Sequence, residues 1–122
     1  MNTTISCFKS NLPNCFVSAQ TTTRIVGTGE WICLSGRVAL QVTGDAQSCQ
    51  VQVERSTNDP LVRANNAPVD LAIKGNPSEG ILVEGYYEPA VAWWRVVIQE
   101  VSGGEIIVDL SGGMGGQLLG GQ

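Results

Sequence analysis

Two adjacent tryptophans, Trp93 and Trp94, lie inside a run of alternating residues that constrains the fold more than any other segment. Apolar side chains occupy every even position from 92 to 98, and a Ser-Gly-Gly turn at 102–104 leads to a second alternating run at 106–110. Alternation of β-branched and aromatic residues on both sides of a glycine turn predicts a β-hairpin over residues 86–110. Because both of its faces carry apolar residues, each face needs a cover.

The two tryptophans must have different environments, because neighbouring residues in a strand point to opposite faces. Trp94 shares its face with Val96 and Ile98, which predicts that Trp94 belongs to the core. Trp93 then points outward with Val97. We expect these two outward residues to contact a partner or another subunit, since tryptophan is enriched at interfaces.

Further alternating runs at 37–43, 49–55 and 69–74, with a strand at 81–88, extend the β pattern through the chain. Residues 37–55 are predicted to form a hairpin with one wet face, and Gly85 is expected to mark a bulge or a close approach. A count of about seven to eight short strands at spacings of about 8–12 residues predicts an all-β protein. Its expected fold is an antiparallel β-sandwich, immunoglobulin-like or jelly-roll-like.

The 122 residues suit one domain. We expect an extended N-terminal arm over 1–23, a sandwich domain over 24–111 and a flexible Gly-rich tail over 112–122. The arm either packs on its own domain or reaches a neighbour, and the tail is either a disordered end or a docking segment. Besides Trp93 and Val97, the candidate interface residues are the apolar anchors of these two segments, Phe8, Phe16, Leu118 and Leu119.

Charge and composition exclude several classes of function. The net charge is −4, and the seven Lys and Arg residues are scattered, whereas nucleic-acid binding needs a concentrated positive face. The chain has no His, which rules out Ser/His/Asp and Cys/His mechanisms within one chain. The sequence shows neither an apolar run of about 18 residues nor a signal-peptide pattern, so we expect no membrane partner and no ordinary secretion.

No residue is predicted to be catalytic or to bind a metal or a cofactor. The cysteines at 7, 15, 33 and 49 lack the paired spacing of zinc sites, and free thiols are expected, with a Cys7–Cys15 bridge as the alternative. An ordered calcium loop is also missing from the sequence. The carboxylates that a glycosidase would need are expected mostly at turns or on outward positions, namely Glu79, Glu84, Glu88, Glu100, Glu105 and Asp109.

An ordered set of short motifs resembles the small β-sandwich structural proteins of tailed bacteriophages. The set begins with the strand SGRVALQVTG at 35–44 and continues with VQVERS at 51–56, WRV at 94–96, SGG at 102–104 and IIVDLS at 106–111. Pro60 departs from the pattern, because such proteins usually carry a turn glycine after the Arg-Ser strand end. The segments before residue 24 and after Ser111 match nothing in the pattern.

The resemblance implies a non-enzymatic virion protein that is assembled in the host cytoplasm. The role we expect first is a capsid decoration or cement protein that binds the outer surface of the head as a homo-oligomer, with a trimer favoured. Its partners would be the major capsid protein or other virion proteins. The alternative is a tail- or neck-associated module that binds carbohydrate on the host surface, with an outward tryptophan as the platform.

Overall fold

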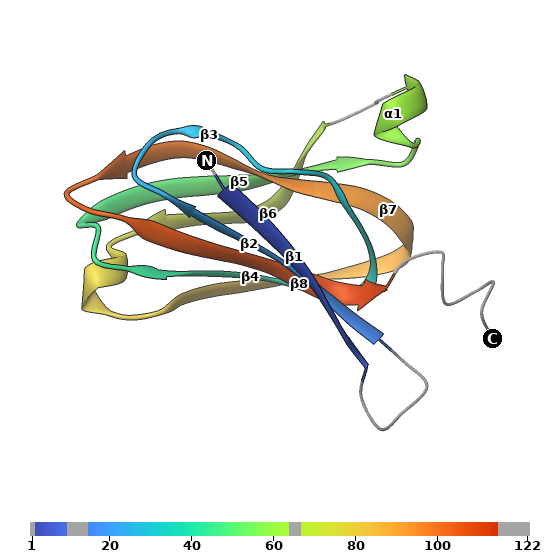
Figure 1. Ribbon diagram of the computed structural model, residues 1–122, viewed down its shortest axis with the longest axis horizontal. Helices are drawn as coiled ribbons and strands as arrows, with labels where there is room; N and C mark the ends of the chain where they lie inside the picture. Colours follow the sequence, from blue (N-terminus) through green and yellow to red (C-terminus); the bar gives the residue numbers. More distant parts are fainter. Residues whose placement is uncertain (1, 10–14, 64–66, 115–122) are drawn as a thin grey trace.

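The computed structural model describes residues 2–9, 15–63 and 67–114, and it describes side chains for 17–62, 67–89 and 91–113. Most of its residues lie in strands (Figure 1). The elements are β1 (Asn2–Lys9), β2 (Cys15–Thr23), β3 (Gly27–Thr28), β4 (Ile32–Gly44), β5 (Ser48–Ser56), α1 (Pro60–Arg63), β6 (Ala67–Gly75), the 3-10 turn η1 (Pro77–Glu79), β7 (Leu82–Ser102) and β8 (Ile106–Met114).

All strands join one antiparallel sheet in the order β1-β2-β8-β4-β7-β5-β6, and the short β3 also pairs with β7. This arrangement confirms the predicted all-β, sandwich-like fold. The order also shows that β7 is central, because it pairs with β4 on one side and with β5 on the other.

A bend in β7 folds the sheet over on itself. Residues 82–88 of β7 pair with β4, and residues 93–102 pair with β5. Tyr86 and Trp94 lie in the same strand, yet their ring centroids are only 5.4 Å apart, whereas an extended strand would separate these positions by about 26 Å. The strand therefore turns sharply near Pro89, and its two halves face each other across the core.

The pairing of β4 with β7 is interrupted at this bend. The register between β4 and β7 shifts between Ser35 and Gly36, and Gly36, with φ of +72°, lies opposite Glu88. A positive φ is readily adopted only by glycine, so Gly36 lets β4 continue through the corner. The alternating run predicted at 37–43 is therefore part of a longer strand that begins at Ile32.

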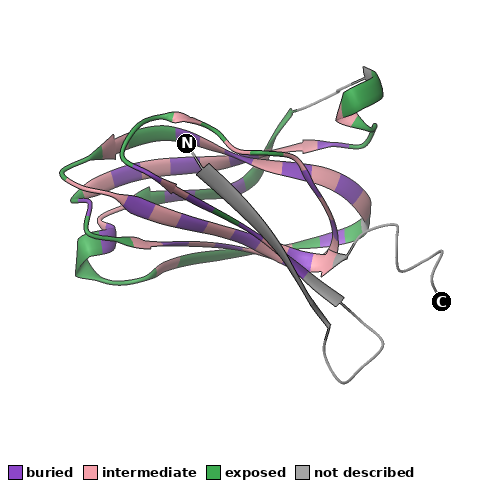
Figure 2. Cartoon of the chain, in the orientation of Figure 1, coloured by how far each residue is buried: buried purple, intermediate pink, exposed green. Residues whose placement is uncertain are grey.

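The core lies between the two folded halves, and buried positions alternate with partly exposed ones along most strands (Figure 2). The predicted inward positions of the alternating runs are confirmed. Trp94 is fully buried and Trp93 is not, as the alternation predicted. The largest fully buried apolar side chains are Trp94, Leu34, Leu40, Leu71, Ile98, Ile106 and Leu110.

Both predicted hairpins are wrong, although their strands exist. β7 pairs with β3, β4 and β5, whereas β8 pairs with β2 and β4. Likewise, β4 pairs with β7 and β8, whereas β5 pairs with β6 and β7. The turns after β4 and β7 therefore cross between the halves of the sandwich, because alternation reports which side chains face inward but not which strand lies alongside.

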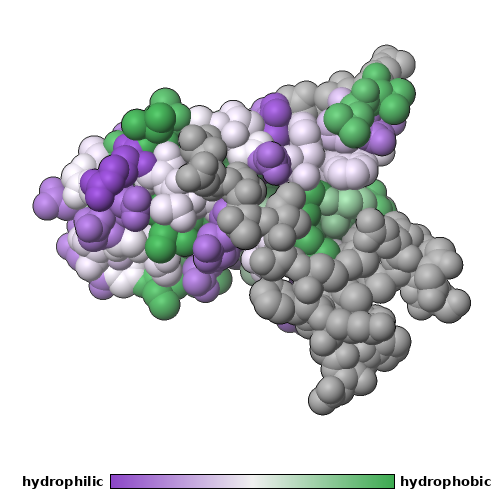
Figure 3. Space-filling view, in the orientation of Figure 1, coloured by the Kyte–Doolittle hydropathy of each residue, from purple (hydrophilic) through white to green (hydrophobic). Residues whose placement is uncertain are grey.

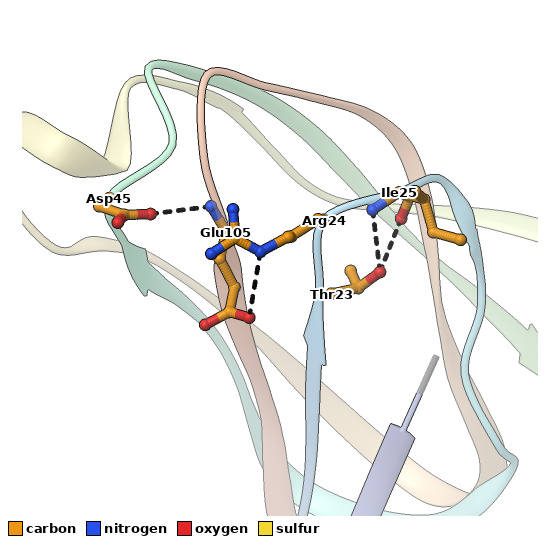
Figure 4. A network of polar contacts seen from close by, with 5 residues as sticks. All are labelled: Thr23, Arg24, Ile25, Asp45 and Glu105. Carbon is orange, nitrogen blue, oxygen red and sulfur yellow. Dashed lines mark hydrogen bonds and ion pairs between the residues drawn. The ribbon is translucent and has the colours of Figure 1, made fainter.

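These two crossing turns bind each other (Figure 4). The Glu105 backbone N–H donates to Asp45 Oδ1 at 2.8 Å, and the Ala46 N–H donates to the Glu105 carbonyl at 3.2 Å. The Arg24 guanidinium lies 3.8 Å from the Glu105 carboxylate. Polar groups at this end of the sandwich are thus paired across two segments that are distant in sequence.

The predicted N-terminal arm is not an extended appendage, because its described residues, 2–9 and 15–23, belong to the sheet and so pack on their own domain. β1 and β2 pair along their whole lengths, and β2 pairs with β8. Val17, Ala19, Thr21 and Thr23 are buried. Because threonine is not counted as apolar, the hydrophobicity pattern did not predict the full length of this strand. At the other end, β8 runs to Met114, so the expected tail boundary at residue 112 falls inside a strand.

Candidate functional site

The most exposed apolar side chains sit on α1, at the end of the loop between β5 and β6. Leu61 is 93% exposed and Val62 is 83% exposed. In the space-filling view a hydrophobic patch marks the place of α1 at the upper right (Figure 3). The Asn-, Asp- and Pro-rich sequence around α1 is typical of a loop and does not by itself predict this patch.

Local hydrogen bonds hold α1 in position. Asp59 accepts from the Leu61 N–H through Oδ1 at 2.9 Å and from the Val62 N–H through its carbonyl at 2.9 Å. The fully buried Ser56 donates its hydroxyl to the Asn58 carbonyl at 2.7 Å. An Asp at the N-cap followed by Pro60 in the first turn is a helix-start signal, and this signal could have revealed α1 in the sequence. The two apolar side chains are therefore displayed on an ordered support.

A second exposed apolar group lies on the first half of β7 and on Ile81, the residue just before it. Ile81, Val83 and Tyr87 point to the outer face and are 63%, 57% and 67% exposed. Within the described part of the chain, residues 82–88 pair with β4 and with no other strand. This segment is therefore an open sheet edge with an apolar outer face.

A hollow of about 520 Å³ lies on this face, around Gly85. Gly85 and its partner Ala39 in β4 are the small residues of its lining, and Tyr87 also lines it. Arg37 provides the only charge among the residues that line it. The register is regular at Gly85, and a Cβ there would come no closer than 3.9 Å to the Val38 carbonyl oxygen, so neither the predicted bulge nor a close approach occurs at this glycine.

The predicted interface residues Trp93 and Val97 lie on the outer face of the second half of β7. Both are partly buried, and Trp93 lies opposite Cys33 of β4 and Ser56 of β5. On the same face, Arg95 stacks on the Trp31 ring at 4.5 Å and forms an ion pair with Glu54 at 2.8 Å. Aromatic and hydrogen-bonding groups thus lie together on this surface.

The other predicted interface residues are placed less fully. Phe8 and Phe16 are direct partners in the β1–β2 register, and their side chains lie outside the described residues. Leu118 and Leu119 lie outside the described residues altogether. The same register sets Cys7 opposite Val17 and Cys15 opposite Lys9, so the two cysteines are not direct partners.

One predicted outward carboxylate is buried instead. Glu88 is 1% exposed at its side chain, and both its oxygens are bound by Arg55. The Arg55 guanidinium also lies 5.9 Å from the centroid of the Trp94 ring. This cluster sits at the bend of β7 and packs against the core, so its arrangement is that of a structural ion pair.

Metal and membrane signals are absent from the described regions. No group of three or more His, Cys, Asp or Glu side chains is placed to hold a metal ion within residues 17–62, 67–89 and 91–113. Among the helices described, none is long and apolar enough to cross a bilayer.

Comparison with known proteins identified no family for this chain. No model of a protein family matches the chain, and no curated protein is similar in sequence.

Proposed function

We propose that the chain is a non-enzymatic structural protein of a bacteriophage virion, which decorates the head by seating α1 in an apolar recess of the major capsid protein or of another virion protein. The observation that carries this proposal is the exposure of Leu61 and Val62 on an ordered helix. Burial of one such side chain contributes about 1.5–3 kcal/mol. Because Asp59 already orders the turn, little conformational entropy is lost when it docks.

The rest of the molecule suits a cement role. A sandwich with one continuous core is a rigid base from which α1 projects (Figure 1). A protein that binds the assembled shell and not the free subunits stabilises the shell by mass action. The motif resemblance to phage sandwich proteins supplies the class of particle.

The test is binding of the full chain to expanded phage heads that lack it. We expect stoichiometric co-sedimentation and a higher melting temperature of the heads. The double variant Leu61→Ser/Val62→Ser should bind about 100-fold more weakly, because two apolar contacts are lost, and should keep the melting temperature of the free protein.

Ile25 and Val26 provide a matched control, since they form a second exposed apolar pair on a different loop. Ile25→Ser/Val26→Ser should bind heads as the unchanged chain does. Failure of the unchanged chain to bind heads would refute the proposal, and so would an equal loss in both double variants.

The outer face around Trp93 favours a second candidate, a tail- or neck-associated module that binds host glycan. Stacking of Arg95 on Trp31 beside Trp93 presents flat apolar surface next to hydrogen-bonding groups, which is the chemistry that a sugar ring needs. Under this candidate, Trp93→Ala abolishes binding to host polysaccharide without unfolding the protein. Head binding that is unchanged in Trp93→Ala supports the first candidate instead.

A further inference from the structure

We propose that the first half of β7, residues 82–88, pairs with the same segment of a second copy of this chain. The two segments run antiparallel around a two-fold axis at Gly85, which makes one sheet continuous across a dimer. This inference goes beyond attachment to a head, because it concerns the free protein and uses a different surface from α1.

The backbone of this segment can pair with another strand. Residues 82–88 are paired on one side with β4, and within the described residues no other strand is paired with them. An edge of this kind presents a row of N–H and C=O groups that can pair with another chain. Its outer face adds the exposed side chains of Val83 and Tyr87.

β6, an outer strand of the same sheet, is better protected against pairing with another chain than this segment of β7 is. β6 carries the exposed residues Pro68, Asp70 and Lys74, and proline and charged side chains are the usual protection of an edge against pairing. Of residues 82–88, only Glu84 is both charged and exposed, since Glu88 is buried against Arg55, and none is a proline. The β7 edge therefore lacks most of the protection that β6 has.

The sequence of the segment selects the axis. An axis at Gly85 sets Val83 opposite Tyr87 of the second copy, an aromatic and β-branched pair of the kind that stabilises sheets. It sets Glu84 opposite Tyr86 of the second copy, so no like charges meet. At the centre the two Gly85 residues face each other without a steric obstacle.

The neighbouring registers are worse. An axis at Glu84 would set the two Glu84 carboxylates directly opposite each other, and an axis at Tyr86 would set Glu84 opposite Glu88 of the second copy. Like charges directly opposite each other in a sheet are destabilising. An axis at Val83 leaves only residues 82–84 to overlap, because β7 begins at Leu82. Charge and overlap both favour Gly85.

Gly85 also provides the test. Its φ is not in the left-handed region and a Cβ there meets nothing closer than 3.9 Å, so the single chain tolerates a side chain at this position. Gly85→Lys places two like charges on the axis, and Gly85→Glu does the same with the opposite sign. Either variant should weaken the dimer at least about fivefold, and an equal mixture of the two should restore it as a mixed dimer.

The measurement is sedimentation equilibrium of the full chain under reducing conditions at up to about 0.1 mM. We expect a mass of two chains for the unchanged protein, a shift toward one chain for each Gly85 variant, and recovery in the mixture. Ala72→Lys, an exposed position on β6, is the matched control and should remain a dimer. Melting temperatures report whether each variant is folded, and Tyr87→Ser is a second variant that removes the cross-copy pair and should also weaken the dimer.

A monomer at the highest concentration would overturn the inference, as would a trimer, dimers that persist in both Gly85 variants, or a mixture that stays monomeric. These outcomes are separable from head attachment. Loss of head binding with an intact dimer refutes the decoration proposal alone, and a monomer that still binds heads refutes the dimer alone.

Discussion

Arg55 and Glu88 form an ion pair that fastens β5 to the bend of β7. Arg55 Nε donates to Glu88 Oε2 at 3.2 Å, and Nη2 binds the other carboxylate oxygen. The hydrogen bond to Glu88 raises the pKa of Arg55. Because Trp94 packs against both Arg55 and the Tyr86 ring, the pair holds together the point where the sheet folds over.

Removal of one partner of this pair should destabilise the protein strongly. Arg55→Met leaves the buried Glu88 carboxylate without its cation, which costs about 2–3 kcal/mol, a value reduced from that of a fully buried pair because the Arg55 side chain is 25% exposed. The loss is measured as the free energy of unfolding in urea. The double variant Arg55→Met/Glu88→Leu should lose less than the two single variants combined, since it leaves no unpaired charge.

Arg24→Ala is the matched control for this experiment. Arg24 pairs with Glu105 at 3.8 Å, and both side chains are well exposed. An exposed pair contributes about 0–1 kcal/mol, so the change should be small. A large effect of Arg24→Ala, or none of Arg55→Met, would contradict this account.

The two tryptophans should differ sharply in their contribution to stability. Trp94→Ala leaves a large cavity in the core and should cost about 3–5 kcal/mol. Trp94→Phe should cost less, because the indole Nε1 is buried without a hydrogen-bond partner among the described residues and its loss breaks no hydrogen bond there. Trp93→Ala should cost about 1 kcal/mol, since the side chain is only partly buried. Thermal unfolding followed by circular dichroism gives all three values, and a reversed order would show that the register is wrong.

Two glycines of the same sheet should respond oppositely to alanine. Gly44 has φ of +126°, and a Cβ there would press on the Glu105 carbonyl oxygen and lie 3.0 Å from Ile106 Cα, so Gly44→Ala should cost at least about 2 kcal/mol. Gly85→Ala should be neutral or should stabilise the free chain by up to about 1 kcal/mol, because it restricts the unfolded chain without strain. Equal effects in unfolding experiments would refute the backbone assignment of the turn after β4.

Because of its two described thiols, the protein should have a lower free energy of unfolding in mild alkali. Burial, with a smaller effect of the Asp59 charge, raises the pKa of Cys33, and burial, with a smaller effect of the Glu100 charge, raises the pKa of Cys49. The unfolded chain then ionises first, at about pH 8.5, so the free energy of unfolding should fall as the pH rises from about 8 to 9.5. Cys33→Ser/Cys49→Ala should show a flatter profile under reducing conditions, and an equally steep one would assign the effect to other groups.

Sequence periodicity predicted the inward faces but not the strand partners. Leu40, Val51, Ile73 and Trp94 are all buried as the alternation required. The pairing of β7 with β4 and β5 could not be read from the same pattern, because a turn such as 103–105 can close a hairpin or cross to the opposite half with the same residues. The full extent of strand β2 was not predicted, since threonine satisfies a buried sheet position without a hydrophobic signature.

Of the candidate surfaces, too, the sequence could predict some and not others. The outward position of Trp93 followed from the inward position of Trp94. The exposure of Leu61 and Val62 on α1 and the open edge around Gly85 depend instead on contacts that the sequence does not show. By itself the sequence determined an all-β chain, its inward residues and the opposite fates of Trp93 and Trp94, because side-chain alternation is a local property of an extended backbone. Only the tertiary structure decided that β7 bends at Glu88 and leaves one edge open, because strand pairing and burial of that carboxylate depend on residues distant along the chain.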